Sequence, residues 1–279
     1  MIAILGTGLL GSGFTQAARK RGEDVHVWNR SPARAKALES TGAVAFIDAA
    51  SAVRGASRVH IVVSDDAAVE GVLGAAKAGF EPGALVIDHS TTSTAGARSR
   101  TARPDITYVH APVFMGPKNA AEATGLMLLS GEHARVERVK PLVAPMTGKV
   151  VELGDRVDAA AAFKLMGNLF LMAMTAGCAD MLGLAKAMGV PLDAAAGLFE
   201  HFNPGAMAGP RTKTIAAGKF DPPSWELAMA RKDARLMQAE ASAAGVELGV
   251  LPAIAAWMDR AIADGDSAKD WTVIAKQFV

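Results

Sequence analysis

The first eleven residues constrain the fold most strongly. The apolar run Ile2–Leu5 passes directly into the turn Gly6-Thr7-Gly8-Leu9-Leu10-Gly11, and a helical pattern follows. In a strand–turn–helix unit, the first glycine permits a tight turn, the second lets backbone approach a pyrophosphate, and the third allows close helix–strand packing. The pyrophosphate then sits on free N–H groups at the helix N-terminus. A glycine-rich turn without a ligand is the alternative. The turn residues predicted to bind a dinucleotide are Gly6, Thr7, Gly8, Leu9, Leu10 and Gly11.

Short apolar runs and helix-like stretches alternate through the first half of the chain. Such alternation is typical of βαβ units and of a doubly wound, mainly parallel sheet covered on both faces, as in a Rossmann domain. Gly13–Arg21 and Ala33–Ser40 are two of the helical stretches. The runs predicted as strands are Ile2–Leu5, Val25–Trp28, Ala43–Phe46, Val59–Val63, Ala84–Ile87 and Ile106–Val109. Two later runs, Gly125–Leu129 and Val150–Leu153, are expected to extend that sheet.

The composition of the sequence changes after about Asp155. Val157–Met188 is rich in Ala and Met, contains no proline and is apolar almost all round. A helix of this kind is normally buried between domains or between subunits. We therefore expect a Rossmann domain over residues 1–157 and an all-α domain over residues 158–279, joined by this long interdomain helix, in a homodimer or homotetramer. Further predicted helices are Leu192–His201, Pro210–Ala217, Ser224–Ala244 and Pro252–Asp264.

The charge balance excludes several classes of partner. Lys and Arg number 29 against 28 Asp and Glu, so the basic excess typical of nucleic-acid or acidic-membrane binding is missing. A single cysteine, Cys178, forms no internal disulfide and no multi-cysteine metal site, which favours a reducing, cytoplasmic location. The longest uncharged run, between Lys164 and Asp180, is shorter than the roughly 20 residues that span a bilayer. We expect neither a metal nor a membrane.

The end of the second predicted strand distinguishes between the two nicotinamide dinucleotides. Sites for NAD usually place Asp or Glu there to hold the ribose 2′-hydroxyl. This chain instead reads Trp28-Asn29-Arg30-Ser31. Arg30 can pair with a 2′-phosphate, while Asn29 and Ser31 add hydrogen bonds. NADP(H) is thus favoured over NAD(H), with a solvated surface arginine as the alternative.

Lys164 and Asn168 stand four residues apart in the long helix and project from one face. Burial of a lysine in apolar surroundings lowers its pKa towards the range useful for acid–base chemistry. Asn168 can position that lysine or bind a substrate oxygen. The alternative is a lysine at an interdomain surface whose head reaches water.

Five motifs follow one another in a familiar order: Gly6–Gly11, Asp88-His89-Ser90-Thr91, Ala111-Pro112-Val113, the Lys164/Asn168 pair and Lys232-Asp233. Together they resemble the β-hydroxyacid dehydrogenase family, which includes 3-hydroxyisobutyrate dehydrogenase, tartronate semialdehyde reductase and glyoxylate/succinic semialdehyde reductases. The resemblance covers essentially the whole chain. It implies a Rossmann domain, a helical C-terminal domain like that of 6-phosphogluconate dehydrogenase, and NADP-dependent hydride transfer. The substrate is expected to be a small hydroxy acid or alcohol, or its aldehyde or semialdehyde.

The resemblance also implies roles for individual residues. Lys164 matches the family's general acid and base, which protonates the carbonyl oxygen in reduction and accepts the hydroxyl proton in oxidation. Asn168 matches the residue that orients the substrate, and Lys232 matches a lysine that closes over the cofactor from the C-terminal domain. The remaining positions matched to the cofactor's ribose and nicotinamide are Val63, Ser64, Asp65 and Thr91.

The chain departs from the family where a substrate carboxylate is usually held. Family members continue Ala-Pro-Val with Ser-Gly-Gly, whereas this chain reads Phe114-Met115-Gly116. Gly167 replaces an asparagine often found before Asn168. If Phe114 and Met115 line the pocket rather than the core, a bulkier or less acidic substrate is expected. The substrate-binding residues predicted are Ser90, Phe114, Met115, Gly116, Lys164 and Asn168, with His110 and His201 as further polar candidates.

Two other functions remain open at this point. Imine reductases share the two-domain architecture and prefer NADPH, but they often carry Asp or Tyr at the position of Lys164. A dinucleotide-binding protein without chemistry is the second alternative. Retention of Lys164, Asn168 and Lys232 together favours the alcohol or aldehyde oxidoreductase.

Overall fold

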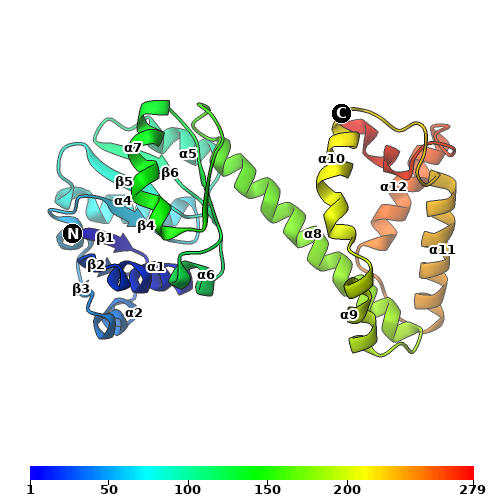
Figure 1. Cartoon of the computed structure of the whole chain (residues 1–279), viewed down its shortest axis with the longest axis horizontal. Helices are drawn as coiled ribbons and strands as arrows, with labels where there is room; N and C mark the ends of the chain where they lie inside the picture. Colours follow the sequence, from blue (N-terminus) through cyan, green and yellow to red (C-terminus); the bar gives the residue numbers. More distant parts are fainter. The chain divides into compact units, whose positions relative to one another are not determined.

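Six of the apolar runs form one parallel sheet in the order β3-β2-β1-β4-β5-β6 (Figure 1). This is the strand order of a Rossmann domain, in which the chain reverses direction across the sheet between β1 and β4. The computed structural model describes all residues from 1 to 279. The strand bounds are β1 Ile2–Leu5, β2 Val25–Trp28, β3 Val44–Phe46, β4 Val59–Ile61, β5 Ala84–Asp88 and β6 Ile106–His110.

The alternation of side chains along β1 explains why both faces of the sheet are covered. Ile2 and Ile4 enter one hydrophobic core together with Phe14 of α1. Ala3 and Leu5 enter a second core, on the opposite face, because successive side chains of a strand point to opposite sides. The predicted doubly wound α/β domain is confirmed. The helices of this part are α1 Leu9–Lys20, α2 Pro32–Lys36, α3 Ala49–Val53, α4 Asp66–Ala76, α5 Thr94–Thr101, α6 Pro117–Glu122 and α7 His133–Val143.

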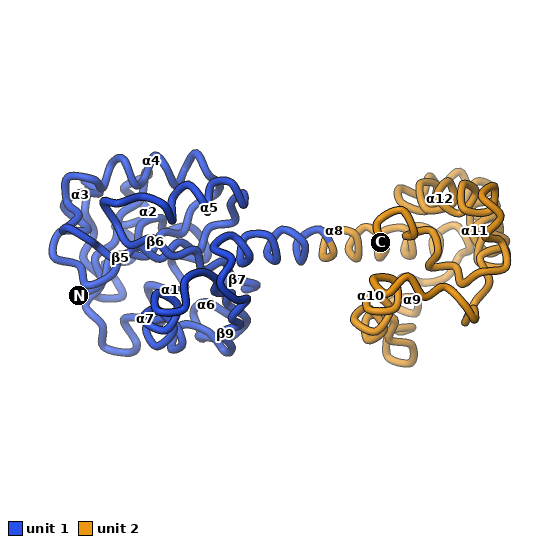
Figure 2. The backbone as a smooth tube through the Cα atoms, turned by 90° about the horizontal axis from the view of Figure 1, so that it is seen from above, with its two compact units in different colours: residues 1–169 blue, residues 170–279 orange.

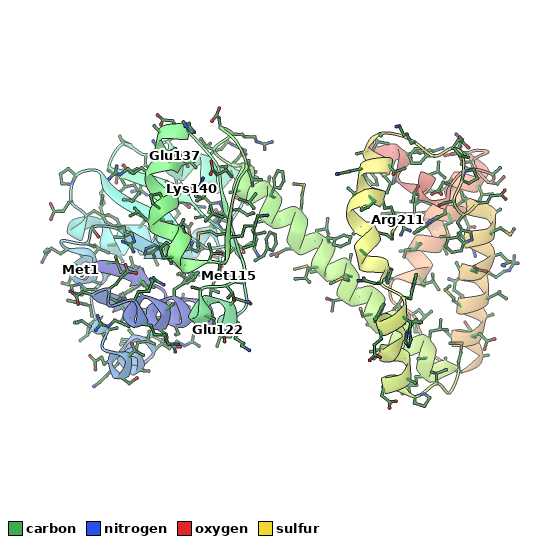
Figure 3. The ribbon with its side chains drawn as sticks, viewed as in Figure 1. Met1, Met115, Glu122, Glu137, Lys140 and Arg211 are labelled. Carbon is green, nitrogen blue, oxygen red and sulfur yellow. The ribbon has the colours of Figure 1, made fainter.

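Helices α1 and α6 pack closely beside one another (Figure 1). A Cβ atom on Gly13 of α1 would lie only 2.9 Å from the Pro117 carbonyl oxygen, so glycine permits this approach. Helix α7 is amphipathic, because Val136 and Val139 are buried in the first core while Glu137 and Lys140 are polar positions of its exposed side (Figure 3).

The prediction that the two later runs extend the main sheet is wrong. They form β8 (Leu126–Leu129) and β9 (Lys149–Glu152), which pair in a separate three-stranded sheet with β7 (Val113–Phe114). Pro112 lies between β6 and β7 and has no N–H to donate to a ladder. Its carbonyl instead accepts a hydrogen bond from the N–H of Leu128.

The long helix α8 runs from Ala159 to Ala187, so it begins two residues after the predicted start at Val157. The chain divides within it into two compact units, Met1–Leu169 and Phe170–Val279 (Figure 2). Many of its apolar side chains are exposed in the single chain, Leu169 at 70% and Met172 at 67% among them. By length and composition alone α8 is also apolar enough to cross a membrane, a test that a helix of a soluble protein can pass too.

The second unit is helical, as predicted. Asp180 of α8 anchors it, because its carboxylate accepts hydrogen bonds from the N–H groups of Gly249, Val250 and Leu251 at 2.7–2.9 Å. In the same unit the Arg211 guanidinium (Figure 3) lies 4.9 Å from the Trp271 ring centroid. The remaining helices are α9 Leu192–His201, α10 Ala208–Ala216, α11 Leu227–Ala243 and α12 Leu251–Ala263, with short 3₁₀ turns at Pro204–Met207 and Trp271–Phe278.

Most predicted helix starts differ from the observed ones by one to four residues; α10 begins at Ala208 rather than Pro210, and α12 at Leu251 rather than Pro252. Helix α1 begins at Leu9, immediately after the glycine turn, rather than at Gly13. Predicted helix Ala33–Ser40 is α2 followed by a 3₁₀ turn. Helix α11 begins at Leu227, so Trp225 lies outside the helix that carries Lys232. The segment before α11 is extended because Glu226 forms an isolated bridge with Asp270.

Candidate active site

The three glycines of the first turn differ in the space that surrounds each of them. Gly6 has a φ of +99°, and a Cβ on it would lie 2.2 Å from the Val62 carbonyl oxygen. A Cβ on Gly11 would lie 1.9 Å from the Gly6 carbonyl oxygen, which makes glycine necessary for the close packing of α1 on β1. Gly8 faces open space, with no atom within 4 Å of a Cβ. The turn therefore leaves the N-terminus of α1 accessible at Gly8, where the backbone can cradle a phosphate.

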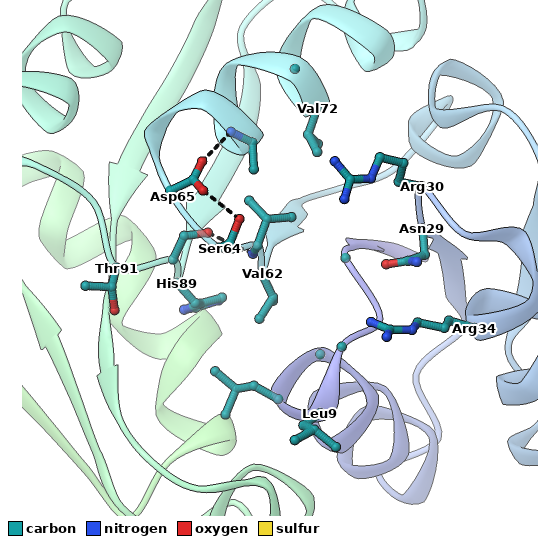
Figure 4. Close-up of a pocket in the computed structure, with 18 of the residues that line it drawn as sticks. Leu9, Asn29, Arg30, Arg34, Val62, Ser64, Asp65, Val72, His89 and Thr91 are labelled. Carbon is teal, nitrogen blue, oxygen red and sulfur yellow. Dashed lines mark hydrogen bonds between the residues drawn. The ribbon is translucent and has the colours of Figure 1, made fainter.

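The loop after β2 is joined to the glycine turn by one side chain. The Asn29 Oδ1 accepts a hydrogen bond from the Thr7 N–H at 3.0 Å, and the Asn29 Nδ2 donates to the Ser31 carbonyl at 3.1 Å. Arg30 and Arg34, both exposed, extend beside this loop (Figure 4). This end of the cavity thus offers two guanidinium groups and no carboxylate.

The loops after β4 and β5 form the next part of the cavity. Ser90 Oγ accepts a hydrogen bond from the Val63 N–H at 2.9 Å, which ties the two loops together. Asp65 caps α4 by accepting from the Ala68 N–H at 2.8 Å, and Ser64 Oγ donates to it at 2.9 Å (Figure 4). These hydrogen bonds, that from Ala68 first, lower the pKa of Asp65 below its usual value. Asp65 is therefore an ionised capping group at the cavity's edge.

A directional chain of hydrogen bonds lies buried beneath these loops. Arg58 Nε donates to His60 Nε2 at 3.1 Å, His60 Nδ1 lies 2.9 Å from His89 Nε2, and His89 Nδ1 lies 2.8 Å from the Ala111 carbonyl oxygen. Because an arginine only donates, the consistent assignment has each histidine neutral and passing one hydrogen bond onward. Burial lowers the pKa of His89 to about 4 and that of His60 well below its usual value. His89 is thus a neutral member of the cavity wall.

Lys164 and Asn168 are brought together on α8. Lys164 Nζ donates to Asn168 Oδ1 at 3.0 Å, and it lies 4.2 Å from the centroid of the Phe114 ring. Burial lowers the pKa of Lys164, because desolvation disfavours the ammonium form. The lysine is therefore a half-buried proton donor or acceptor held at one end of the cavity.

One cavity of about 980 Å³ joins these parts. Its volume suits a large ligand such as a dinucleotide. Val113 and Met115 of the loop region around β7 also line it. The predicted residues that line this cavity are Gly6, Gly8, Leu9, Leu10, Gly11, Asn29, Arg30, Ser31, Val63, Ser64, Asp65, Ser90, Thr91, Met115 and Lys164.

Five predicted site residues lie elsewhere. Thr7 is buried behind the turn, and Phe114 and Asn168 contact Lys164 without lining the cavity themselves. The Gly116 N–H donates to Asn119 Oδ1 at 2.9 Å at the start of α6. Lys232 belongs to the second unit, where its Nζ lies 2.9 Å from the Asp233 carboxylate.

The two histidines considered as polar candidates are not part of the cavity wall. His110 is buried, and its Nε2 lies 2.9 Å from the Ser90 carbonyl oxygen. His201 is the exposed last residue of α9.

Several lining residues were missed by sequence reasoning. Arg34 follows Arg30 by four residues at the start of a short helix, a spacing that could have indicated it. His89 belongs to a motif that served only for the family resemblance, without a predicted role of its own. The other lining residues outside the prediction are Trp28, Val62, Ala67, Ala68, Gly71, Val72 and Val113.

Comparison with known proteins identifies the class of this chain. A model of the NAD binding domain of 6-phosphogluconate dehydrogenase matches residues 1–154. Together with the strand order and the glycine turn, this match defines a dinucleotide-binding protein. Within that class, the chain belongs to the β-hydroxyacid dehydrogenase family.

Relatives in this family are distant. A probable 3-hydroxyisobutyrate dehydrogenase of Mycobacterium bovis is 29% identical over 192 residues, which is 68% of this chain and 65% of that protein's own length. An L-threonate dehydrogenase of Pectobacterium atrosepticum is 26% identical over 69% of this chain and 66% of its own length. An uncharacterized oxidoreductase of Bacillus subtilis is 23% identical over 99% of this chain and 98% of its own.

Solved structures share the fold at lower identity. An imine reductase from Myxococcus stipitatus in complex with NADP⁺ matches with a TM-score of 0.92 at 19% identity, covering all of both chains. A reductive aminase from Aspergillus terreus in complex with NADPH matches with a TM-score of 0.89 at 21% identity, covering 100% of this chain and 99% of its own. At these identities the likeness concerns the fold alone.

Proposed function

We propose that this protein is an NADP(H)-dependent oxidoreductase that interconverts a hydroxyl and a carbonyl group, with Lys164 as the general acid and base. The observation that carries the proposal is that Lys164 lines the same cavity as the glycine turn. A proton donor and a dinucleotide cradle in one cavity are the two parts that carbonyl reduction requires. The substrate is a small hydroxy acid or alcohol, or the corresponding aldehyde or semialdehyde.

Each group has a task that follows from its surroundings. The bound dinucleotide would supply or accept the hydride at the substrate carbon. In reduction, the Lys164 ammonium donates a proton to the carbonyl oxygen, and in oxidation the neutral amine accepts the hydroxyl proton. Asn168 Oδ1, 3.0 Å from Nζ, holds the amine in place. The lowered pKa of Lys164 brings both protonation states closer to neutral pH.

The preference for NADP(H) rests on Arg30 and Arg34. A guanidinium pairs bidentately with a phosphate, and the absence of a carboxylate at this end of the cavity removes the usual partner of a free 2′-hydroxyl. Asn29 is already bound to Thr7 and Ser31, so we assign it to the shape of the loop rather than to the 2′-phosphate.

Imine reduction is the main alternative, since the structural neighbours include imine reductases. An imine is reduced most readily as an iminium cation, and a lysine ammonium beside that cation is repelled by it. Lys164 therefore favours a neutral carbonyl over an iminium. A purely dinucleotide-binding role gives no function to the half-buried Lys164–Asn168 pair.

The proposal is tested by following NADPH absorbance at 340 nm. The purified protein is offered NADPH or NADH with small aldehydes, semialdehydes and cyclic imines, and NADP⁺ or NAD⁺ with 3-hydroxy acids and neutral alcohols. We expect turnover of carbonyl and hydroxyl compounds with higher kcat/KM for the phosphorylated cofactor. Turnover of imines alone would show that the protein is an imine reductase. Binding of NADPH without turnover of any compound would support a purely dinucleotide-binding function.

We also propose that a second copy of the chain covers the exposed apolar side chains of α8, in a homodimer or a higher homo-oligomer. An exposed apolar surface of this extent marks an interaction site. A bilayer is a poorer occupant, because the helix carries Lys164 and Asp180, and Asp180 holds the start of α12. We place the protein in the cytoplasm, without a membrane, metal or nucleic-acid partner.

A further inference from the structure

The Phe114 ring occupies space that α8 leaves free only because residue 167 is glycine. A Cβ on Gly167 would lie 2.3 Å from Cζ of the ring, well inside van der Waals contact. On the same helix face, Lys164 Nζ lies 4.2 Å from the ring centroid. Phe114 and Gly167 are thus one steric unit, and this unit sets an aromatic surface beside the proposed proton donor.

The loop after β7, where family members usually hold a carboxylate, offers little to an anion in this chain. The Gly116 N–H donates to Asn119 Oδ1 at 2.9 Å, so this amide is not free. Met115 packs against the first hydrophobic core. Val113 is apolar and buried. The loop after β7 therefore offers apolar surface and no free donor among these groups.

The charges of the cavity lie in the wrong place for an acidic substrate. Its cationic lining residues besides Lys164 are Arg30 and Arg34, which extend beside the loop after β2 (Figure 4). Taking a carboxylate out of water is unfavourable unless charged or N–H donors replace that water. Beside Phe114 the only cation is Lys164 itself, and the negative face of a ring does not attract an anion.

We propose that Phe114 and Gly167 select an uncharged carbonyl compound with an apolar or aromatic substituent over a carboxylate-bearing compound of the same size. This inference rests on the proposed function, in which Lys164 donates the proton. A neutral carbonyl oxygen takes its hydrogen bond from Lys164, and its substituent reaches the neighbouring ring, whose centroid lies 4.2 Å from Nζ just outside the cavity lining. A carboxylate in the same place pairs with the Lys164 ammonium and removes it from the carbonyl oxygen.

The test compares substrates that differ only by replacement of a carboxylate with an acetyl group. The pairs are glyoxylate with methylglyoxal, and succinic semialdehyde with 4-oxopentanal. For the wild type we expect kcat/KM to be about tenfold or more higher for the neutral member of each pair. Phe114→Ser, which removes the ring and supplies a hydroxyl donor, is expected to shift this ratio by about tenfold towards the acid.

Gly167→Ala provides the matched steric control. Alanine is a better helix former than glycine, so Tm should not fall through the helix itself. The added Cβ nevertheless displaces the ring, and kcat/KM for the neutral substrates should fall about tenfold or more. In the double variant Phe114→Ser/Gly167→Ala the ring is gone, so alanine should cost little beyond the single Phe114→Ser change. This non-additivity is what a shared steric unit requires.

Ligand binding separates this inference from the proposed function. Calorimetry measures Kd of butyrate and of butyramide for the NADPH complex, and neither compound is reduced. We expect the wild type to bind butyramide with a lower Kd than butyrate, and Phe114→Ser to abolish or reverse that difference. This result would support the selection even if no turnover is observed. If the wild type reduces carbonyl compounds but prefers the acids, and if Phe114→Ser does not change that preference, the inference is overturned while the proposed function stands. Equal Kd values for the two ligands in both proteins would overturn it as well.

Discussion

At the scale of the residue, the proposed preference for NADP(H) rests on two exposed side chains, Arg30 and Arg34. Each guanidinium is free of any carboxylate among the cavity-lining residues near it. A hydrogen bond to a charged group contributes about 1.5–3 kcal/mol, and 1.4 kcal/mol corresponds to tenfold in Kd. We therefore expect Arg30→Leu and Arg34→Leu each to weaken NADPH binding about tenfold or more, with NADH binding nearly unchanged. Arg54→Leu, at an exposed arginine outside the cavity, is the control, and fluorescence titration gives all Kd values. Equal weakening of NADH and NADPH would contradict the 2′-phosphate assignment.

At the scale of the element, the glycine turn offers a matched pair of substitutions. Gly8 has a φ of −69° and open space for a Cβ, so Gly8→Ala should fold with stability close to that of the wild type. Because that space is where a phosphate would approach, its Kd for NADPH should rise about tenfold or more. Gly11→Ala places a Cβ 1.9 Å from the Gly6 carbonyl oxygen and should lose about 1–3 kcal/mol of unfolding free energy. Chemical denaturation measures the unfolding free energy of both variants. Equal losses of stability in Gly8→Ala and Gly11→Ala would refute the different roles of the two glycines.

The buried histidine chain gives the sheet a specific response to acid. The folded-state pKa values of His60 and His89 lie below the ordinary 6.5, so below that pH the unfolded chain binds protons that the folded chain does not. Stability is therefore lost as pH falls from about 6.5 towards 4, by about 1.4 kcal/mol per pH unit and per histidine. Denaturation between pH 7 and 5 should show this slope, and His60→Phe/His89→Phe should flatten it, whereas exposed His133→Asn should not. NMR signals of the wild-type rings that report protonated imidazoles at pH 5.5 would contradict the account.

The elements differ in how far local sequence determines them. The glycine turn, the strands of the main sheet and the long helix carry their signals within a few consecutive residues, and these predictions are confirmed. The placement of β8 and β9 depends on where Pro112 breaks the sheet and on pairing with β7, which strand-like runs alone do not encode. The start of α11 depends on the pairing of Glu226 with Asp270, 44 positions further along the chain.

The residues of the candidate site likewise divide into those that local sequence predicts and those that depend on distant contacts. Turn residues and Arg30 were accessible to sequence reasoning because their chemistry is local. The contact between Phe114 and Gly167 was not, since it joins a strand to a helix 53 positions later. The two substitutions looked like independent departures from the family, and only the packing shows that the first needs the second.

At the scale of the whole molecule, the exposed face of α8 predicts self-association. Met172→Glu replaces an apolar side chain that is 67% exposed and should convert the oligomer into a monomer, because burying an unpaired carboxylate in an interface is costly. Ile47→Glu is the control, since Ile47 is 87% exposed but belongs to the segment after β3 and not to α8. Light scattering measures the mass. A wild-type mass equal to the 28.8 kDa chain would refute the dimer, and partition of the wild type into detergent micelles would favour a membrane instead.

Lys164 is the residue on which the proposed proton transfer depends. Single-turnover reduction of a responsive carbonyl substrate by the NADPH complex should be compared between wild type, Lys164→Ala and Lys164→Arg, alongside Kd for NADPH. We predict that Lys164→Ala lowers the hydride-transfer rate about 10²–10⁴-fold without a comparable change in Kd. Because reduction needs the ammonium, the wild-type rate should also fall with rising pH at a pKa below that of free lysine. A Lys164→Ala protein that transfers hydride at the wild-type rate, with an unchanged pH profile, would contradict the proposed mechanism.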